Sequence, residues 1–200
     1  MNAKGWEQRA FLNELAPAKT MNTLTEQRDG MATLISNSIC EGCPRILSLI
    51  DRLSEGQTVS IAEAEILALL HSVTVYGLWP TWKRKEPIAE FLDIYGPKLI
   101  RKMRETFGAR CADYFKAIYI DRETEFMHEF PTIVQGEPRE TYVVGKWIRR
   151  IQGTYDAELE AKGIHAGTSI VHVGTLFVLI SGRLLADNDL YRKFACLFGA

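Results

Sequence analysis

The apolar residues between positions 61 and 77 recur at intervals of three and four residues, which is the spacing of one face of an α-helix. Ser60 and Glu63 form a capping-box pattern directly before this run. Similar spacing returns along most of the chain, and no Asn-Gly or Asp-Gly step lies between alternating apolar runs, as a β-hairpin would need. We therefore expect an all-α fold, a single-domain helical bundle of about seven or eight helices.

Glycines and prolines divide the chain into its predicted helices. Residues 1–30 hold few apolar side chains beyond a short helix at 6–15, so we expect an N-terminal arm followed by one α-helical domain over 31–200. One core is feasible, because 46% of the 200 residues are hydrophobic. We also expect two C-terminal helices, at about 168–186 and 188–198. Helix breaks or ends are predicted at Gly42–Pro44, Gly96–Pro97, Pro131 and Gly163.

Nothing in the sequence predicts export or a membrane span. The first nine residues are too polar for the apolar part of a secretory signal. The longest apolar stretch, Ile170–Ile180, has 11 residues, whereas a helix that crosses a bilayer needs about 20. Four cysteines in a chain without a signal peptide are typical of a reducing compartment. We therefore expect a cytoplasmic protein.

Two short patterns could carry chemistry. Cys40 and Cys43 form a C-x-x-C pair, which could cycle through a disulfide or supply half of a zinc site, although the other two cysteines are isolated in the sequence. Glu125 and His128 have the Glu-x-x-His spacing that lets one helix face hold an iron or manganese ion. A thiol-dependent or metal-dependent enzyme is therefore one alternative for the function.

A haem held by one histidine is a further form of this alternative, because a histidine on an apolar helix face can either ligate iron or complete a core. The sequence contains no nucleophile elbow, phosphate-binding loop, dinucleotide fingerprint or H-E-x-x-H metal motif. We therefore predict no cofactor and lean against an enzyme. Whether the histidines converge in space stays open for all four of them: His71, His128, His165 and His172.

The charges change sign in the middle of the chain, although the net charge is only −1. From Lys83 to Arg110 there are eight basic and four acidic residues, and from Cys111 to Glu140 there are seven acidic and three basic residues. Adjacent segments of opposite sign either neutralise each other within one molecule or favour docking onto a charged partner.

Tryptophans accompany the positive charges at two places. The leading hypothesis is therefore an interaction or regulatory module, which docks an acidic protein or a second copy of itself through a basic and aromatic surface. A second alternative is binding of single-stranded nucleic acid, since aromatic rings stack on bases and cations contact phosphates. The predicted docking residues are Trp79, Trp82, Lys83, Arg84, Lys85, Lys98, Arg101, Lys102, Trp147, Arg149 and Arg150.

Overall fold

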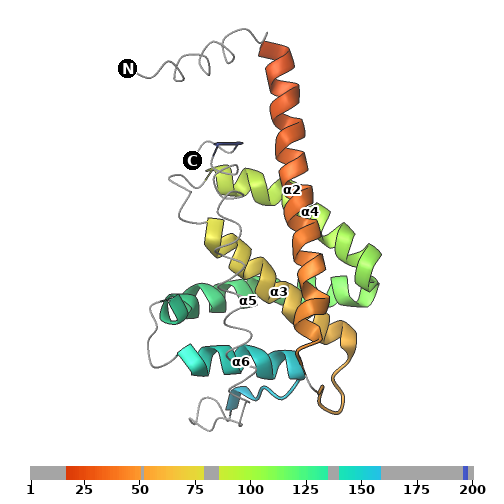
Figure 1. Ribbon diagram of the computed structural model, residues 1–200, viewed down its shortest axis with the longest axis vertical. Helices are drawn as coiled ribbons and strands as arrows, with labels where there is room; N and C mark the ends of the chain where they lie inside the picture. The colour runs from red at the N-terminus through yellow and green to blue at the C-terminus, as the bar shows by residue number, and fades with distance from the viewer. Residues whose placement is uncertain (1–16, 51, 79–85, 135–139, 159–195, 198–200) are drawn as a thin grey trace.

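The computed structural model describes residues 17–50, 52–78, 86–134, 140–158 and 196–197 (Figure 1). These residues form α-helices and no strand, which confirms the predicted all-α fold. The predicted helix at 6–15 lies outside the described residues, as do the two C-terminal helices apart from residues 196–197. The helices are α2 (Pro17–Leu47), α3 (Val59–Leu78), α4 (Glu86–Phe107), α5 (Ala109–Val134) and α6 (Glu140–Gln152).

Helix α3 lies at the centre of the bundle and packs against α2, α5 and α6 (Figure 1). Its bounds agree with the helix predicted at 61–77, but the N-terminal cap is Thr58 and not Ser60, because Thr58 Oγ1 accepts the N–H of Ile61 at 3.3 Å. By length and composition Val59–Tyr76 could cross a membrane, yet 72% of this window is buried inside the fold. The core helix of a folded domain meets the same criteria, so this window is weak evidence for a membrane span.

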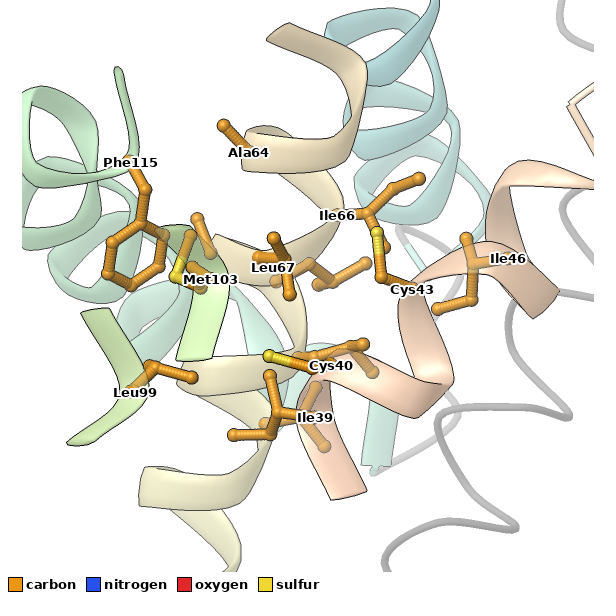
Figure 2. Packing of buried hydrophobic residues seen from close by; sticks show 14 of the residues in the cluster. Ile39, Cys40, Cys43, Ile46, Ala64, Ile66, Leu67, Leu99, Met103 and Phe115 are labelled. Atoms are coloured by element: carbon orange, nitrogen blue, oxygen red, sulfur yellow. The ribbon is translucent and has the colours of Figure 1, made fainter. Parts of the chain in front are cut away.

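Helices α2 and α4 continue through prolines at which breaks were predicted. Pro44 lies inside α2 and Pro97 lies inside α4, so the predicted ends at Gly42–Pro44 and Gly96–Pro97 are wrong. Each proline removes one backbone hydrogen bond, but each helix buries an unbroken apolar face on both sides of it. In α2 the buried face includes Ile35, Ile39, Cys43 and Ile46, and in α4 it includes Phe91, Tyr95, Leu99 and Met103. Figure 2 shows Ile39, Cys43 and Ile46 of α2 with Leu99 and Met103 of α4. Burial of these faces holds the helices together across the missing bonds.

Helices α2 and α5 also extend beyond their predicted bounds. Helix α2 begins at Pro17, so residues 17–30 of the predicted arm are helical. This segment is held mainly by polar contacts: Arg28 Nε donates to Leu197 O at 2.8 Å, and Lys98 Nζ lies 2.8 Å from Asp29 Oδ1. Apolar spacing could not have indicated a helix that is held in this way. Helix α5 reaches Val134, so the predicted end at Pro131 is also wrong.

Helix α6 ends at Gln152, about three turns before the predicted end near Gly163. Gly153 has a φ of 76°, a left-handed conformation that terminates helices and favours glycine. The last turn is closed by the N–H of Thr154, which donates to Arg149 O at 2.8 Å. The structure therefore assigns the C-terminal stop signal of this helix to Gly153.

Replacement of Gly153 by alanine is expected to lower the free energy of unfolding by about 2–4 kcal/mol. A Cβ there would lie 2.7 Å from Ser54 Oγ and 2.8 Å from Gln57 Cβ, in addition to the backbone strain. Gly108→Ala is the matched control, because its φ of 89° is also positive while an added Cβ meets nothing within 4 Å. Urea unfolding followed by circular dichroism should show a loss of about 1 kcal/mol for this control. Equal losses in the two variants would contradict the close packing at Gly153.

Candidate functional site

The main candidate site is a pocket of about 340 Å³ between α3, α4 and α5. Helix α4 contributes a large part of its wall, and α3 and α5 complete it. The volume lies at the lower end of the range for small-molecule sites, so it suits a compact ligand. Its apolar lining residues are Leu92, Leu99, Ile100 and Phe115.

A chain of three hydrogen-bonding side chains lies in the wall of this pocket. His71 Nε2 lies 3.0 Å from Glu123 Oε2, and His71 Nδ1 lies 3.0 Å from the Tyr95 hydroxyl. An ionised carboxylate can only accept, so Nε2 carries the proton that is donated to Glu123. In a neutral ring, Nδ1 then accepts the Tyr95 O–H. This arrangement fixes the orientation of the His71 ring.

Aromatic rings surround the imidazole of His71. The ring of Tyr95 is stacked on it at 5.7 Å between centroids, and the rings of Phe115 and Tyr119 approach it edge to face at 5.9 Å. Phe115 and Tyr119 are stacked on each other at 5.4 Å. Such rings present electron-rich faces, which attract cations.

The charged groups of the pocket are acidic. Asp93 and Glu123 line it, and no lysine or arginine of the described residues does so. Pro97 also lines the pocket and has no N–H, so the α-helical hydrogen bond to the carbonyl of Asp93, four residues earlier, is missing. The pocket therefore combines two acidic residues with aromatic rings.

The predicted docking residues do not come together on one described surface. Trp79, Trp82, Lys83, Arg84 and Lys85 lie outside the described residues. On α4, Arg101 is exposed, Lys102 is half-buried, and Lys98 is paired with Asp29 of α2. A basic face on α4 is therefore present, but one of its three cations is partly neutralised within the chain.

The predicted docking residues of α6 lie in the interior, which corrects the surface placement that we expected. Trp147 is 1% exposed and Arg149 is 4% exposed, and the side chain of Arg150 is 11% exposed. The acids that accompany these cations come from α5: Arg150 Nη2 lies 2.7 Å from Glu125 Oε1, and Lys146 pairs with Glu125 and Glu129. Much of the acidic charge of α5 is thus neutralised within the chain.

The C-x-x-C pair is part of the core. Cys40 and Cys43 extend from α2 toward Ile66 and Leu67 of α3 (Figure 2), and both thiols are free and buried. Burial raises the pKa of Cys40 to about 11, and it raises the pKa of Cys43 even further above the ordinary value. Thiols of this kind are poor nucleophiles at neutral pH, because only the thiolate reacts.

Thiol labelling of the native chain is expected to be slow at Cys40, Cys43 and Cys111 and fast at the exposed Cys196. Burial also raises the pKa of Cys111, to about 12. The raised pKa values favour the folded state at neutral pH. This contribution falls as the pH rises past the ordinary thiol pKa of about 8.5, because the unfolded thiols ionise first. Ellman's reagent with and without urea measures these rates, and fast native labelling of Cys40 or Cys43 would show a reactive pair.

The Glu-x-x-His pattern does not form a metal site with other described residues. Glu125 is engaged by Lys146 and Arg150, and His128 is exposed. Burial alone would raise the pKa of Glu125, but the hydrogen bond from Lys146 and the charge of Arg150 outweigh it and lower the pKa. No group of three His, Cys, Asp or Glu side chains that could hold a metal is found among the described residues, and His165 and His172 lie outside them.

Of the two histidines within the described residues, His71 lines the pocket and His128 does not. Both of its ring nitrogens have hydrogen-bond partners, so a haem iron would have to displace Tyr95 or Glu123. Sequence reasoning missed these two partners, because they lie 24 and 52 positions from His71 and on other helices. Comparison of the chain with protein-family models, with curated proteins and with solved structures found no match.

Proposed function

We propose that this chain binds a small organic amine in the pocket between α3, α4 and α5. The observation that carries the proposal is the combination of aromatic rings with acidic charges only, Asp93 and Glu123, around one concave site. An ammonium group in this pocket would lie against ring faces and within reach of carboxylates. An anionic ligand would meet like charges instead, which costs affinity.

The distribution of exposure suggests how the ligand lies. Asp93 is exposed, Glu123 has a side chain that is 28% exposed, and His71 and Tyr95 are buried. The pocket therefore runs from an acidic entrance to a buried polar end. An ammonium N–H can be accepted by a carboxylate near the entrance, while an apolar body contacts Leu92 and Phe115.

A matched set of probes tests this proposal: 2-phenylethylamine, the neutral 2-phenylethanol and the anionic phenylacetate. Isothermal titration should give the amine an affinity about tenfold higher than the alcohol, which corresponds to one charge-assisted hydrogen bond. Glu123→Gln should reduce this preference, because the amide still accepts the proton of His71 Nε2 but carries no charge. Equal binding of the amine and the carboxylate would contradict the proposal.

A blocking variant separates the pocket from the rest of the surface. Gly96 lines the pocket, and a Cβ at this position meets nothing within 4 Å, so Gly96→Leu should fill the space without a backbone clash. We expect it to abolish amine binding while the circular dichroism stays that of the wild type. Gly30→Leu is the control, because Gly30 is also helical, is equally open and lies on α2.

We also propose, from the charge layout, that the chain docks an acidic partner or a second copy of itself in the cytoplasm. The exposed Arg101 beside Lys102 on α4 favours this role, and free buried thiols suit a reducing compartment. Sedimentation at low and high salt tests self-docking. A mass that falls to that of the monomer with added salt, or in Arg101→Glu, would support it, and a monomer under all conditions would remove self-docking.

A further inference from the structure

A second recess, of about 190 Å³, lies where the C-terminal end of α6 meets α3 and α5, and its charge is opposite to that of the amine pocket. Its walls include two guanidinium groups, Arg122 and Arg150, and one carboxylate, Glu65. The phenol rings of Tyr114 and Tyr155 also line it. The lining residues thus include two positive charges and one negative charge, and Glu125, which does not line the recess, pairs with Arg150.

The two arginines differ in how many of their N–H donors already have partners. Arg122 is held by a bidentate pair in which Nε and Nη2 both lie 2.8 Å from the carboxylate oxygens of Glu65. Arg150 uses Nη2 for Glu125, but its Nε is buried without a hydrogen-bond partner among the described residues. A buried N–H without a partner costs free energy, so a ligand that accepts this proton would be stabilised.

Tyr155 orients the guanidinium group of Arg150. The Arg150 Cζ atom lies 3.9 Å from the centroid of the Tyr155 ring, which covers one face of the planar group. Stacking of this kind leaves the N–H bonds in the plane of the guanidinium free to donate. An acceptor would therefore approach Nε in the plane of the group, where it has to displace the neighbouring side chains that bury this atom.

The recess lies at the C-terminal, negative end of α6, but the carbonyls there are hydrogen-bonded, which limits their repulsion of an anion. The last carbonyls of α6 all have donors: Thr154 N and Gly153 N bond the carbonyls of Arg149 and Arg150, Gln57 Nε2 bonds that of Ile151 at 2.9 Å, and Ser54 N bonds that of Gln152 at 2.9 Å. Ile61, in the first turn of the 20-residue helix α3, also lines the recess. The positive end of that helix dipole adds to the attraction of the second arginine.

We propose that this recess binds an oxyanion group, a phosphate or a carboxylate, through Arg150 Nε with Arg122 beside it. Isothermal titration of the full chain with inorganic phosphate and with acetate, in a low-chloride buffer, tests this directly. We expect saturable binding, and the tighter of the two probes identifies the source of the oxyanion. Absence of saturable binding for both would overturn the proposal.

Arg150→Lys is the decisive variant, because it keeps the positive charge beside Glu125 but removes Nε and the planar group. We expect it to weaken oxyanion binding about tenfold. Arg104→Lys, at the exposed pair with Asp113, should leave binding unchanged. Equal affinities in wild type and Arg150→Lys would overturn the proposal, as would an equal loss in Arg104→Lys.

Two further measurements keep the test independent of folding and of the amine pocket. Tyr155→Phe keeps the ring under Arg150 and all charges, so it should fold as the wild type and retain most of the oxyanion affinity, whereas Tyr155→Ala should lose affinity with the stacking. Gly96→Leu should block the amine and leave oxyanion binding intact. Loss of oxyanion binding in Gly96→Leu would contradict a separate site.

Discussion

Replacement of Trp147 by alanine is expected to lower the free energy of unfolding by about 3–5 kcal/mol. The side chain is 1% exposed, and it meets the ring of Phe126 edge to face at 5.6 Å between centroids. Removal of the indole leaves a cavity beside α3 and α5 that the surrounding helices can only partly close. Urea unfolding of the two proteins, with far-UV circular dichroism as the signal, measures this loss.

This variant distinguishes a core residue from a docking anchor. A surface anchor would lose partner binding on truncation while the fold stayed nearly as stable as before. Arg101→Ala is the control, because Arg101 is exposed on α4 and its truncation should change stability by less than about 0.5 kcal/mol. If Trp147→Ala lowered the free energy of unfolding as little as Arg101→Ala does, the interior position of Trp147 would be contradicted.

The second large effect is expected at the buried ion pair between α3 and α5. Glu65→Gln should cost about 3 kcal/mol, because the side chain of Glu65 is 4% exposed and both of its oxygens accept from Arg122 at 2.8 Å. Desolvation alone would lower the pKa of Arg122, but the hydrogen bonds and the charge of Glu65 outweigh it and raise the pKa. The variant therefore leaves a guanidinium without its compensating charge in the interior.

Asp113→Asn provides the matched control, because Asp113 pairs with Arg104 at the surface. The N–O distance of that pair is 3.0 Å, close to the 2.8 Å of the buried pair. Both side chains of that pair are more than half exposed, so its loss should cost less than about 1 kcal/mol. Chemical unfolding of both variants under the same conditions gives the comparison. Similar losses of unfolding free energy in Glu65→Gln and Asp113→Asn would mean that burial does not make the Glu65–Arg122 pair more important for stability than the surface pair.

The sequence was sufficient for the fold class and for the bounds of α3, which its apolar spacing indicates, although the cap is Thr58 and not Ser60. The sequence was misleading at Pro44 and Pro97. A proline predicts a helix break because it removes one backbone hydrogen bond, but burial of the apolar face that continues beyond each proline outweighs that loss. In α4 that face consists of residues four positions apart, and its burial depends on α2 and α5. Local rules cannot supply such a tertiary term.

The candidate site was less accessible to sequence reasoning than the fold. The sequence marked His71 as either a core histidine or a ligand, but its partners Tyr95 and Glu123 become neighbours only when α3, α4 and α5 pack together. The Lys-Trp-Ile-Arg-Arg pattern of α6 resembled a surface because it is rich in cations. Two of its cations, Lys146 and Arg150, instead pair with Glu125 and Glu129 of α5, which lie in the acidic segment of the sequence.

The most direct test of the amine-binding proposal is a methyl and aromatic NMR titration of the full chain with 2-phenylethylamine. The account predicts that signals of Ile100 and Phe115, which line the pocket, shift progressively to saturation in the wild type and in Gly30→Leu. The same signals should stay in place in Gly96→Leu. Unchanged Ile100 and Phe115 signals in the wild type, or saturable shifts in Gly96→Leu, would contradict a binding site for amines in this pocket.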